Sequence, residues 1–139
     1  MTMSMYDSVD SLQRSARRQR RRAVAHGEFL SAVEFCRRRS ASPARLRTLM
    51  HQGDVFDVAF ANKRLYPAVL ASVRCVRLSR LDRLCRQLAP LPTWLRYDVL
   101  TSAKGSLGGK SILQLLGRGA GYRRARWYAG ATVADNRGD

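Results

Sequence analysis

Acidic residues, histidines and cysteines are all scarce in this chain of 139 residues. Ten Asp and Glu stand against 26 Lys and Arg, which gives a net charge of +16, and the chain has two histidines and three cysteines. No stretch approaches the roughly 18 consecutive apolar residues that span a membrane. The cysteines form no Cys-x-x-Cys pair and no signal peptide is recognisable, so we expect a protein of the reduced cytoplasm.

The shortage of acids and histidines also argues against catalysis and metal binding. His26 and His51 have no Cys, Asp or Glu at the spacing of a metal site. The ten acids are scattered, and none are paired for acid–base chemistry. The Gly-Lys-Ser triplet at 109–111 has Lys104 where a phosphate-binding loop requires its first glycine. We therefore expect no enzymatic activity, no metal and no cofactor.

The excess of positive charge points to a polyanionic partner. A pI near 11.4 exceeds the value of about 9 that marks nucleic-acid-binding domains, although arginines that are merely solvated would give the same number. Residues 1–27 predict a basic flexible arm that follows phosphates; a helix ordered only on binding and a solvated tail are the alternatives. The phosphate-binding residues expected in this arm are Arg17, Arg18, Arg20, Arg21 and Arg22.

The segment after this arm has the pattern of two helices joined by a short break. Phe29, Val33 and Cys36 recur at i, i+4 and i+7, which predicts a first helix. Ser42 and Pro43 suit the cap and first turn of a second helix. The apolar stripe of this second helix and the glycine that ends it are Leu46, Leu49, Met50 and Gly53.

The opposite side of the second helix carries side chains that suit a phosphate backbone and base edges. They are Arg45, Arg47, Thr48, His51 and Gln52. Two short apolar runs follow, 55–60 and 64–66, around a turn at 61–63, which predicts a β-hairpin. Residues 28–72 thus predict a helix-turn-helix with a wing. Lys63 and Arg64 lie at its tip, either against the DNA backbone or simply in solvent.

Residues 73–133 predict a compact helical domain for dimerisation or partner binding, and 134–139 a polar tail. We expect helices from Ser79, with Asp82 completing an acidic capping box, from Thr93, around 112–116, and over 122–131. The aromatics Trp94, Tyr97, Trp127 and Tyr128 suit a core or a stacking surface for unpaired bases. The predicted fold class is mainly α: a helix-turn-helix with a short hairpin, followed by a small helical domain.

Part of this second half resembles a known family. Trp94-Leu95, the stretch from Leu107 to Leu116, and Gly119 resemble the toxin-binding domain of the Xre/MbcA/ParS-like antitoxins. The segments Gly53, 55–56 and 66–68 resemble the form in which a helix-turn-helix precedes that domain, so the resemblance covers about residues 28–130. The chain departs from the family in three ways: Ile112 stands where Pro is usual, the positive charge is larger, and the amino end is rich in arginine.

The resemblance implies an all-α dimeric regulator that binds operator DNA. Many members also neutralise a RES-type toxin by docking this domain over its active site. Carried onto this chain, the partner contacts would fall on Trp94, Leu107, Gly108, Gly109, Lys110 and Ser111.

Taken together, the sequence predicts a homodimeric, sequence-specific DNA-binding regulator that is antitoxin-like. One alternative is a protein-interaction module, an antitoxin or adaptor that neutralises a RES-type toxin. Another is an accessory protein that binds RNA, or any nucleic acid, without sequence preference. A third is a structural protein of a virus or phage that packages nucleic acid. DNA is the favoured partner, RNA and a toxin protein are further ones, and a membrane is not expected.

Overall fold

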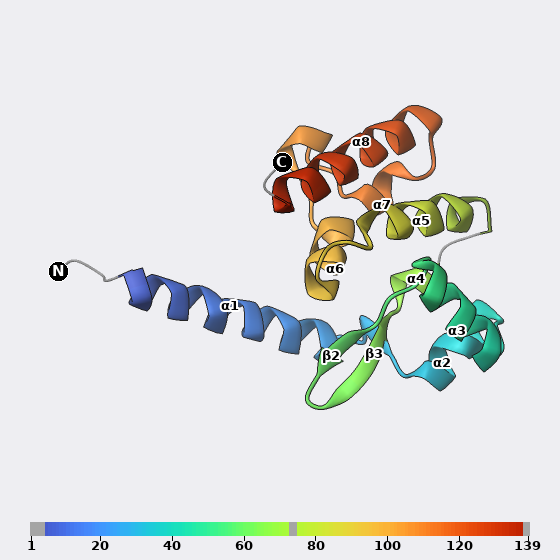
Figure 1. The fold of residues 1–139 in the computed structure, drawn as a ribbon, viewed down its shortest axis with the longest axis horizontal. Coiled ribbons are helices and arrows are strands. Elements are labelled where there is room, and N and C mark those ends of the chain that lie inside the picture. Colours follow the sequence, from blue (N-terminus) through green and yellow to red (C-terminus); the bar gives the residue numbers. More distant parts are fainter. Residues whose placement is uncertain (1–4, 73–74, 138–139) are drawn as a thin grey trace.

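The computed structural model describes residues 5–72 and 75–137 and is mainly helical (Figure 1). A small antiparallel sheet lies among the helices, which confirms the predicted fold class. The strands are β1 (Phe29–Leu30), β2 (Val58–Phe60) and β3 (Lys63–Pro67). The helices are α1 (Met5–Ala25), α2 (Ala32–Arg39), α3 (Pro43–Gln52), α4 (Val69–Ser72), α5 (Cys75–Leu88), α6 (Thr93–Thr101), α7 (Ile112–Leu115) and α8 (Gly119–Asn136), with a 3₁₀ turn at Gly105–Leu107.

The second helix of the predicted pair forms as its local signals require. The Ser42 hydroxyl accepts a hydrogen bond from the Arg45 amide at 3.0 Å, so Ser42 caps α3, and Pro43 occupies the first turn. Leu46 and Leu49 are buried, and Gly53 ends the helix with a φ of 83°. These features confirm the predicted start, buried stripe and end of α3.

The predicted first helix was wrong in its start and in its buried face. Ser31 caps α2 by accepting a hydrogen bond from the Glu34 amide, so Phe29 precedes the helix. Phe29 lies instead in β1, opposite Pro67 of β3. With the helix starting at Ala32, Phe35 is fully buried and Val33 is 71% exposed. The i, i+4, i+7 spacing from Phe29 was therefore a coincidence across a strand and a helix.

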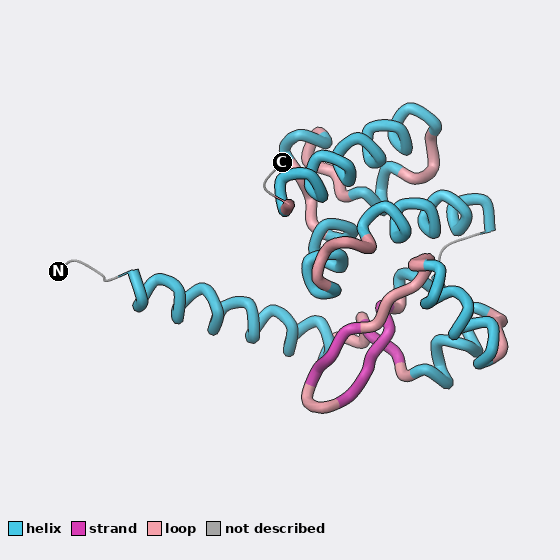
Figure 2. Tube along the Cα trace, viewed as in Figure 1, coloured by secondary structure: helices cyan, strands magenta, loops and turns pink. Residues whose placement is uncertain are grey.

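The hairpin forms as predicted and gains a third strand that the sequence did not reveal. The sheet order is β1-β3-β2, with both neighbours of β3 antiparallel to it (Figure 2). Ala61 and Asn62 form the turn with φ values of 49° and 63°. Two successive positive φ angles are typical of the tight hairpin turn whose twist matches the flanking strands.

The helices of the carboxyl half differ from prediction mainly at their ends. α5 begins at Cys75, so Ser79 lies inside the helix. The Asp82 carboxylate accepts a hydrogen bond from Arg39 of α2 and forms no capping box. α7 is capped by Ser111, whose hydroxyl accepts from the Gln114 amide while the Gln114 side chain accepts from the Ser111 amide. α8 runs from Gly119 to Asn136, which is longer than the predicted 122–131 and includes part of the predicted tail.

One buried arginine ties the helix-turn-helix to the carboxyl half. The Arg39 guanidinium, on α2, donates to the carbonyl of Leu70 at 2.9 Å and to both carboxylate oxygens of Asp82 at 3.0 and 2.9 Å. Its side chain is only 7% exposed. A second ion pair joins Arg86 of α5 to the buried Asp54, with 2.5 Å between Nε and Oδ1. The apolar core of the described residues includes members of both halves; the predicted boundary at 72/73 adjoins residues 73–74, which lie outside the described ranges.

The amino-terminal segment is helical, which corrects the expected flexible arm for residues 5–25. The carboxyl end of α1 lies against the body, where Ala23 and Val24 pack on the core. The amino-terminal part of α1 extends away from the other elements (Figure 1).

The Arg39 ion pair yields a stability prediction. Arg39→Ala leaves the Asp82 carboxylate in a largely buried site without its cation, so we expect a loss of about 3–5 kcal/mol in the free energy of unfolding. Arg38 pairs with Glu34 and is about half exposed, so Arg38→Ala should cost under about 1 kcal/mol. Urea denaturation followed by circular dichroism measures both. Equal losses for the two variants would contradict the role given to Arg39.

Candidate nucleic-acid interface

All five side chains predicted on the polar side of α3 are exposed: Arg45, Arg47, Thr48, His51 and Gln52. They do not project as one group, however. Each residue turns an α-helix by about 100°, so Arg45 and Arg47 are about 160° apart and flank the helix on opposite sides. Arg47, Thr48 and His51 share the side opposite the buried Leu46 and Leu49. The expectation that all five residues lie on the side opposite the apolar stripe is therefore corrected for Arg45.

Thr48 makes a bond that restricts what it can offer a ligand. Its hydroxyl donates to the carbonyl of Ala44, one turn earlier, at 3.2 Å. The hydroxyl oxygen can still accept a hydrogen bond, and its methyl group remains available for apolar contact. Arg47 and His51 are consequently the two strongest donors on the outer face of α3.

The hairpin tip presents two cations with different surroundings. Lys63 and Arg64 are both exposed, as predicted. Arg64 lies 3.3 Å from a carboxylate oxygen of Asp57, which is mostly buried at the base of the hairpin. This ion pair neutralises part of the charge of Arg64, so Lys63 is the better phosphate contact.

The arginines of α1 divide between two sides of the helix. Arg14, Arg17, Arg18 and Arg21 recur at i, i+3, i+4 and i+7 and line one shallow basic surface. Arg20 lies elsewhere, with its guanidinium 5.0 Å from the ring centroid of Trp94 on α6. Arg22 is exposed in the last turn. Arg20, one of the five arginines predicted to bind phosphate, therefore contacts Trp94 within the protein.

Trp94 and Tyr97 form a joint between α6, α1 and the sheet. The Trp94 indole donates to the carbonyl of Ala59 at 3.2 Å, and its ring lies 5.2 Å from that of Phe29. The Tyr97 hydroxyl donates to the Glu28 carboxylate at 2.8 Å. Burial, and then the bond to Glu28, raise the pKa of Tyr97 well above its usual value. Trp94 thus holds elements of the chain together, a role that differs from the partner contact expected of it.

The other residues expected to contact a partner protein fall into two sets. Leu107 is buried in the core and Ser111 is buried as the cap of α7, so both have structural roles. Gly108, Gly109 and Lys110 form an exposed loop. The two glycines have φ values of 66° and 78°, a conformation that side chains disfavour, which explains the glycine pair without a ligand.

A second basic surface lies between α5 and α8. Ser79, Arg80, Arg83, Gly119, Tyr122 and Arg123 line a depression there. Trp127, one turn after Arg123 on α8, is 70% exposed. The sequence left open whether Trp127 belongs to the core or to a stacking surface. In the structure, Trp127 is exposed to solvent.

Side chains that could hold a metal ion are not grouped in the described ranges. Within residues 5–72 and 75–137, no three His, Cys, Asp or Glu side chains are grouped to hold a metal ion. The Cys85 thiol is fully buried, and this burial raises its pKa far above the usual value, which keeps it a thiol at neutral pH. Among the described helices, none combines the length and the apolar character needed to cross a membrane.

Comparison with known proteins adds no relative. No family model, no curated protein and no solved structure matches the chain. The antitoxin resemblance of the carboxyl half therefore stays a prediction.

The hairpin turn provides a test of the tip. Ala61 has a φ of 49°, where a Cβ atom costs about 1 kcal/mol, so Ala61→Gly should stabilise the protein by up to that amount. Ala59→Gly, two residues earlier in β2, should instead destabilise the protein. Glycine increases the conformational entropy of the unfolded chain, and a strand residue has no backbone strain that glycine would relieve. Thermal unfolding of the two variants compares them; a loss of stability in Ala61→Gly would contradict the turn geometry.

Proposed function

We propose that the protein is a sequence-specific DNA-binding regulator that inserts α3 into the major groove. The observation that carries the proposal is the composition of the exposed side of α3. Its core side is filled by Leu46 and Leu49, and its outer side offers Arg47, Thr48 and His51 around the small side chain of Ala44. A capped helix of this kind, at the second position of a two-helix unit, is the element that contacts base edges in helix-turn-helix proteins.

The surrounding elements support a backbone contact on both sides of α3. The hairpin tip offers Lys63, and Arg45, about 160° from Arg47 around α3, offers a further cation at the edge of the helix. The order α1-β1-α2-α3-β2-β3, with β1 paired to β3, joins the hairpin and the two helices through one small sheet. The arginine face of α1 adds affinity that does not depend on sequence.

We further propose that the carboxyl half carries the second, antitoxin-like activity. The exposed loop Gly108, Gly109 and Lys110 supplies the surface for a partner protein. A gene for a small RES-type toxin beside the gene for this chain would favour that activity.

Single-stranded nucleic acid is a second candidate ligand, and Trp127 is the observation that favours it. An exposed indole flanked by arginines can stack an unpaired base while the cations hold the phosphates. Arg123 connects Trp127 to the depression between α5 and α8, where Arg80 and Arg83 lie.

Fluorescence anisotropy on a selected operator and on random duplexes tests the first function. Arg47→Ala and His51→Ala should reduce discrimination between the two duplexes by about 1–3 kcal/mol each, since they remove contacts to base edges. The matched change Arg17→Ala/Arg18→Ala should weaken binding to both duplexes equally and flatten its dependence on salt. Wild type that binds neither duplex would end this proposal.

Tryptophan fluorescence tests the second ligand. In a Trp94→Phe background, the exposed Trp127 is the remaining tryptophan, and a stacked base should quench its fluorescence on addition of oligothymidine. Trp127→Ala should weaken single-strand binding by about 1–3 kcal/mol, whereas Trp127→Phe should retain most of it. Duplex binding serves as the control and should not change in either variant. Unquenched fluorescence at saturating oligonucleotide would exclude stacking.

A further inference from the structure

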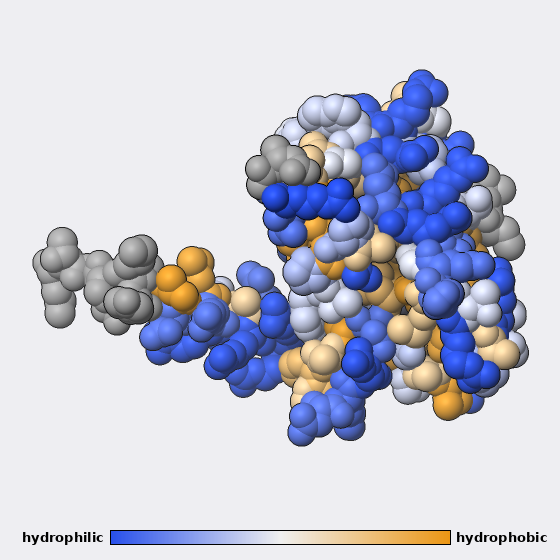
Figure 3. Space-filling view, in the orientation of Figure 1, coloured by the Kyte–Doolittle hydropathy of each residue, from blue (hydrophilic) through white to orange (hydrophobic). Residues whose placement is uncertain are grey.

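The depression between α5 and α8 gathers positive charge from both helices. Arg80 and Arg83 of α5 and Arg123 of α8 line an open space of about 530 Å³, and no acid is among its described lining residues. Figure 3 shows hydrophilic side chains gathered over this part of the molecule. The one acid of α5, Asp82, is bound by Arg39. Within the described part of the chain, Arg83 and Arg123 form no ion pair.

Two contacts within the protein hold Arg80 in place. Its guanidinium donates to the carbonyl of Leu116 at 2.6 Å and lies 5.2 Å from the ring centroid of Tyr122. Tyr122 also lines the depression, and its hydroxyl is buried without a hydrogen-bond partner among the described residues. A buried hydroxyl in this state destabilises a protein, so it is a group that a bound ligand can satisfy.

The first turn of α8 adds amide donors to the same depression. Gly119, its first residue, is part of the lining. The first hydrogen bond of the helix joins the Tyr122 amide to the Arg118 carbonyl at 2.8 Å, so the amides of residues 119–121 have no partner within the helix. Arg118 occupies the cap position, and its side chain makes no capping bond. The partial positive charge of such a helix end attracts anions.

The Arg123 side chain lies over this end of α8. Its Nη1 atom would be 3.9 Å from a methyl group placed on Gly119. The helix therefore brings a guanidinium beside its own unbonded amides, and Arg83 lines the same space from α5. Guanidinium and backbone N–H groups are the donors that bind phosphate oxygens most strongly in proteins.

The number of donors favours a terminal phosphate over one within a strand. Each guanidinium carries five N–H groups, and the helix end adds its amides. A phosphate within a strand has two free oxygens and one negative charge. A terminal phosphate has three free oxygens and a charge of about −1.5 to −2 at pH 7. A concave site with three arginines matches the terminal group more closely.

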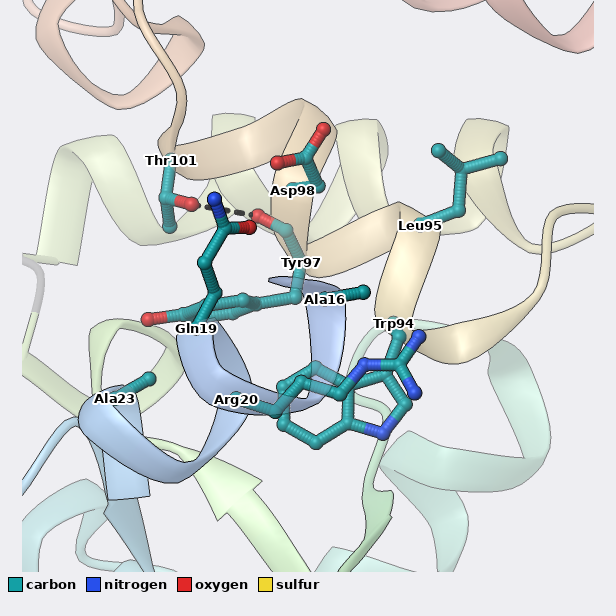
Figure 4. Close-up of a pocket in the computed structure, with 9 residues that line it drawn as sticks. All are labelled: Ala16, Gln19, Arg20, Ala23, Trp94, Leu95, Tyr97, Asp98 and Thr101. Carbon is teal, nitrogen blue, oxygen red and sulfur yellow. Dashed lines mark hydrogen bonds between the residues drawn. The ribbon is translucent and has the colours of Figure 1, made fainter. Parts of the chain in front are cut away.

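The concavity between α1 and α6 has a different chemistry. Its lining combines Arg20 with the acid Asp98 and with the rings of Trp94 and Tyr97. Figure 4 shows the Arg20 side chain against the Trp94 ring, and its guanidinium lies 5.0 Å from the ring centroid. Since the Asp98 carboxylate repels phosphate, this second space does not select the same ligand.

We propose that the depression between α5 and α8 binds a terminal phosphate group. Arg83, Arg123 and the first amides of α8 donate to its oxygens, and Arg80 is fixed beside them. A free nucleotide and the 5′ end of a nucleic-acid strand both offer this chemistry. The site rests on neither function proposed above, because a small anion is enough to occupy it.

Isothermal titration calorimetry at constant ionic strength tests the choice of ligand. Wild type should bind adenosine 5′-monophosphate. Adenosine, which has no phosphate, and a dinucleoside monophosphate, which has only a phosphate within a strand, should each bind about tenfold more weakly or less. A monophosphate that does not bind, or that binds no more tightly than the dinucleoside, would overturn the proposal.

Neighbouring arginines of α8 separate a site from general attraction by charge. Arg83→Gln and Arg123→Gln should each weaken monophosphate binding about tenfold, because each removes charge-assisted hydrogen bonds. Arg124→Gln is the matched control, since it removes the same charge at the next position of α8 but outside the lining, and it should bind as wild type does. Equal losses in Arg123→Gln and Arg124→Gln would mean that net charge alone attracts the ligand.

Arg118→Ser tests the helix end separately. Arg118 has φ −125° and ψ 142°, which suit a capping residue, so a serine there should bond to the amides of the first turn and stabilise α8. Its hydroxyl then competes with phosphate for these amides, so binding should weaken several-fold while the melting temperature rises. A stabilised Arg118→Ser protein that binds the monophosphate as wild type does would overturn the role given to the amides.

Two oligothymidines distinguish the sources of phosphate. If a strand end is the ligand, the 5′-phosphorylated strand should displace the monophosphate at lower concentration than the same strand with a 5′ hydroxyl. Equal displacement by the two strands would assign the site to a free nucleotide. Failure of the single-strand binding proposed for Trp127 would leave monophosphate binding intact, so the two proposals fail separately.

Discussion

The buried guanidinium of Arg39 is the interaction on which the arrangement of the two halves depends. It connects α2, the carbonyl at α4 and the carboxylate of Asp82 on α5. Burial raises the pKa of Asp82, and the neighbouring Arg39 opposes that rise, so each charge is tolerable only in the presence of the other. Hydrophobic contacts alone would allow several orientations of α2 on α5. One nitrogen of Arg39 donates to both carboxylate oxygens of Asp82 and another donates to the carbonyl of Leu70, and these three bonds fix one orientation of α2, which α3 follows.

The aromatic cluster around Phe29 is the second contact that holds the helices and the sheet in one arrangement. The ring of Phe29 lies 5.2 Å from Trp94 and 4.7 Å from Tyr97, while Arg20 covers the outer side of Trp94. This cluster connects α1, β1 and α6, and the Trp94 indole extends it to β2. The arginine face of α1 and the hairpin tip are therefore held in one frame with α3. A ligand that spans these surfaces would meet cations already in position and would not have to order them.

Local sequence signals predicted α3 correctly. The elements that were missed or misplaced depend on contacts between residues far apart in the sequence. The cap at Ser42, the buried leucines and Gly53 all act within one helix, so the sequence contains everything needed to place it. β1 has two residues and exists only because β3 lies beside it, which no local pattern reveals. Asp82 resembled a capping residue because its partner, Arg39, is 43 positions away. On α1, the arginines between Val9 and Ala23 interrupt the apolar stripe, so the sequence left a helix there as one of several alternatives.

The large positive charge connects the two proposed activities of α1 and α3. Each copy carries +16, so two copies repel each other over the whole surface. Under the proposed function, a DNA duplex that contacts two copies would neutralise much of that charge and so lower the cost of bringing them together. By linkage, DNA that favours the dimer must be bound more tightly by the dimer than by the monomer. If the proposed DNA binding holds, the arginine-rich face of α1 would therefore help two copies to bind one duplex cooperatively.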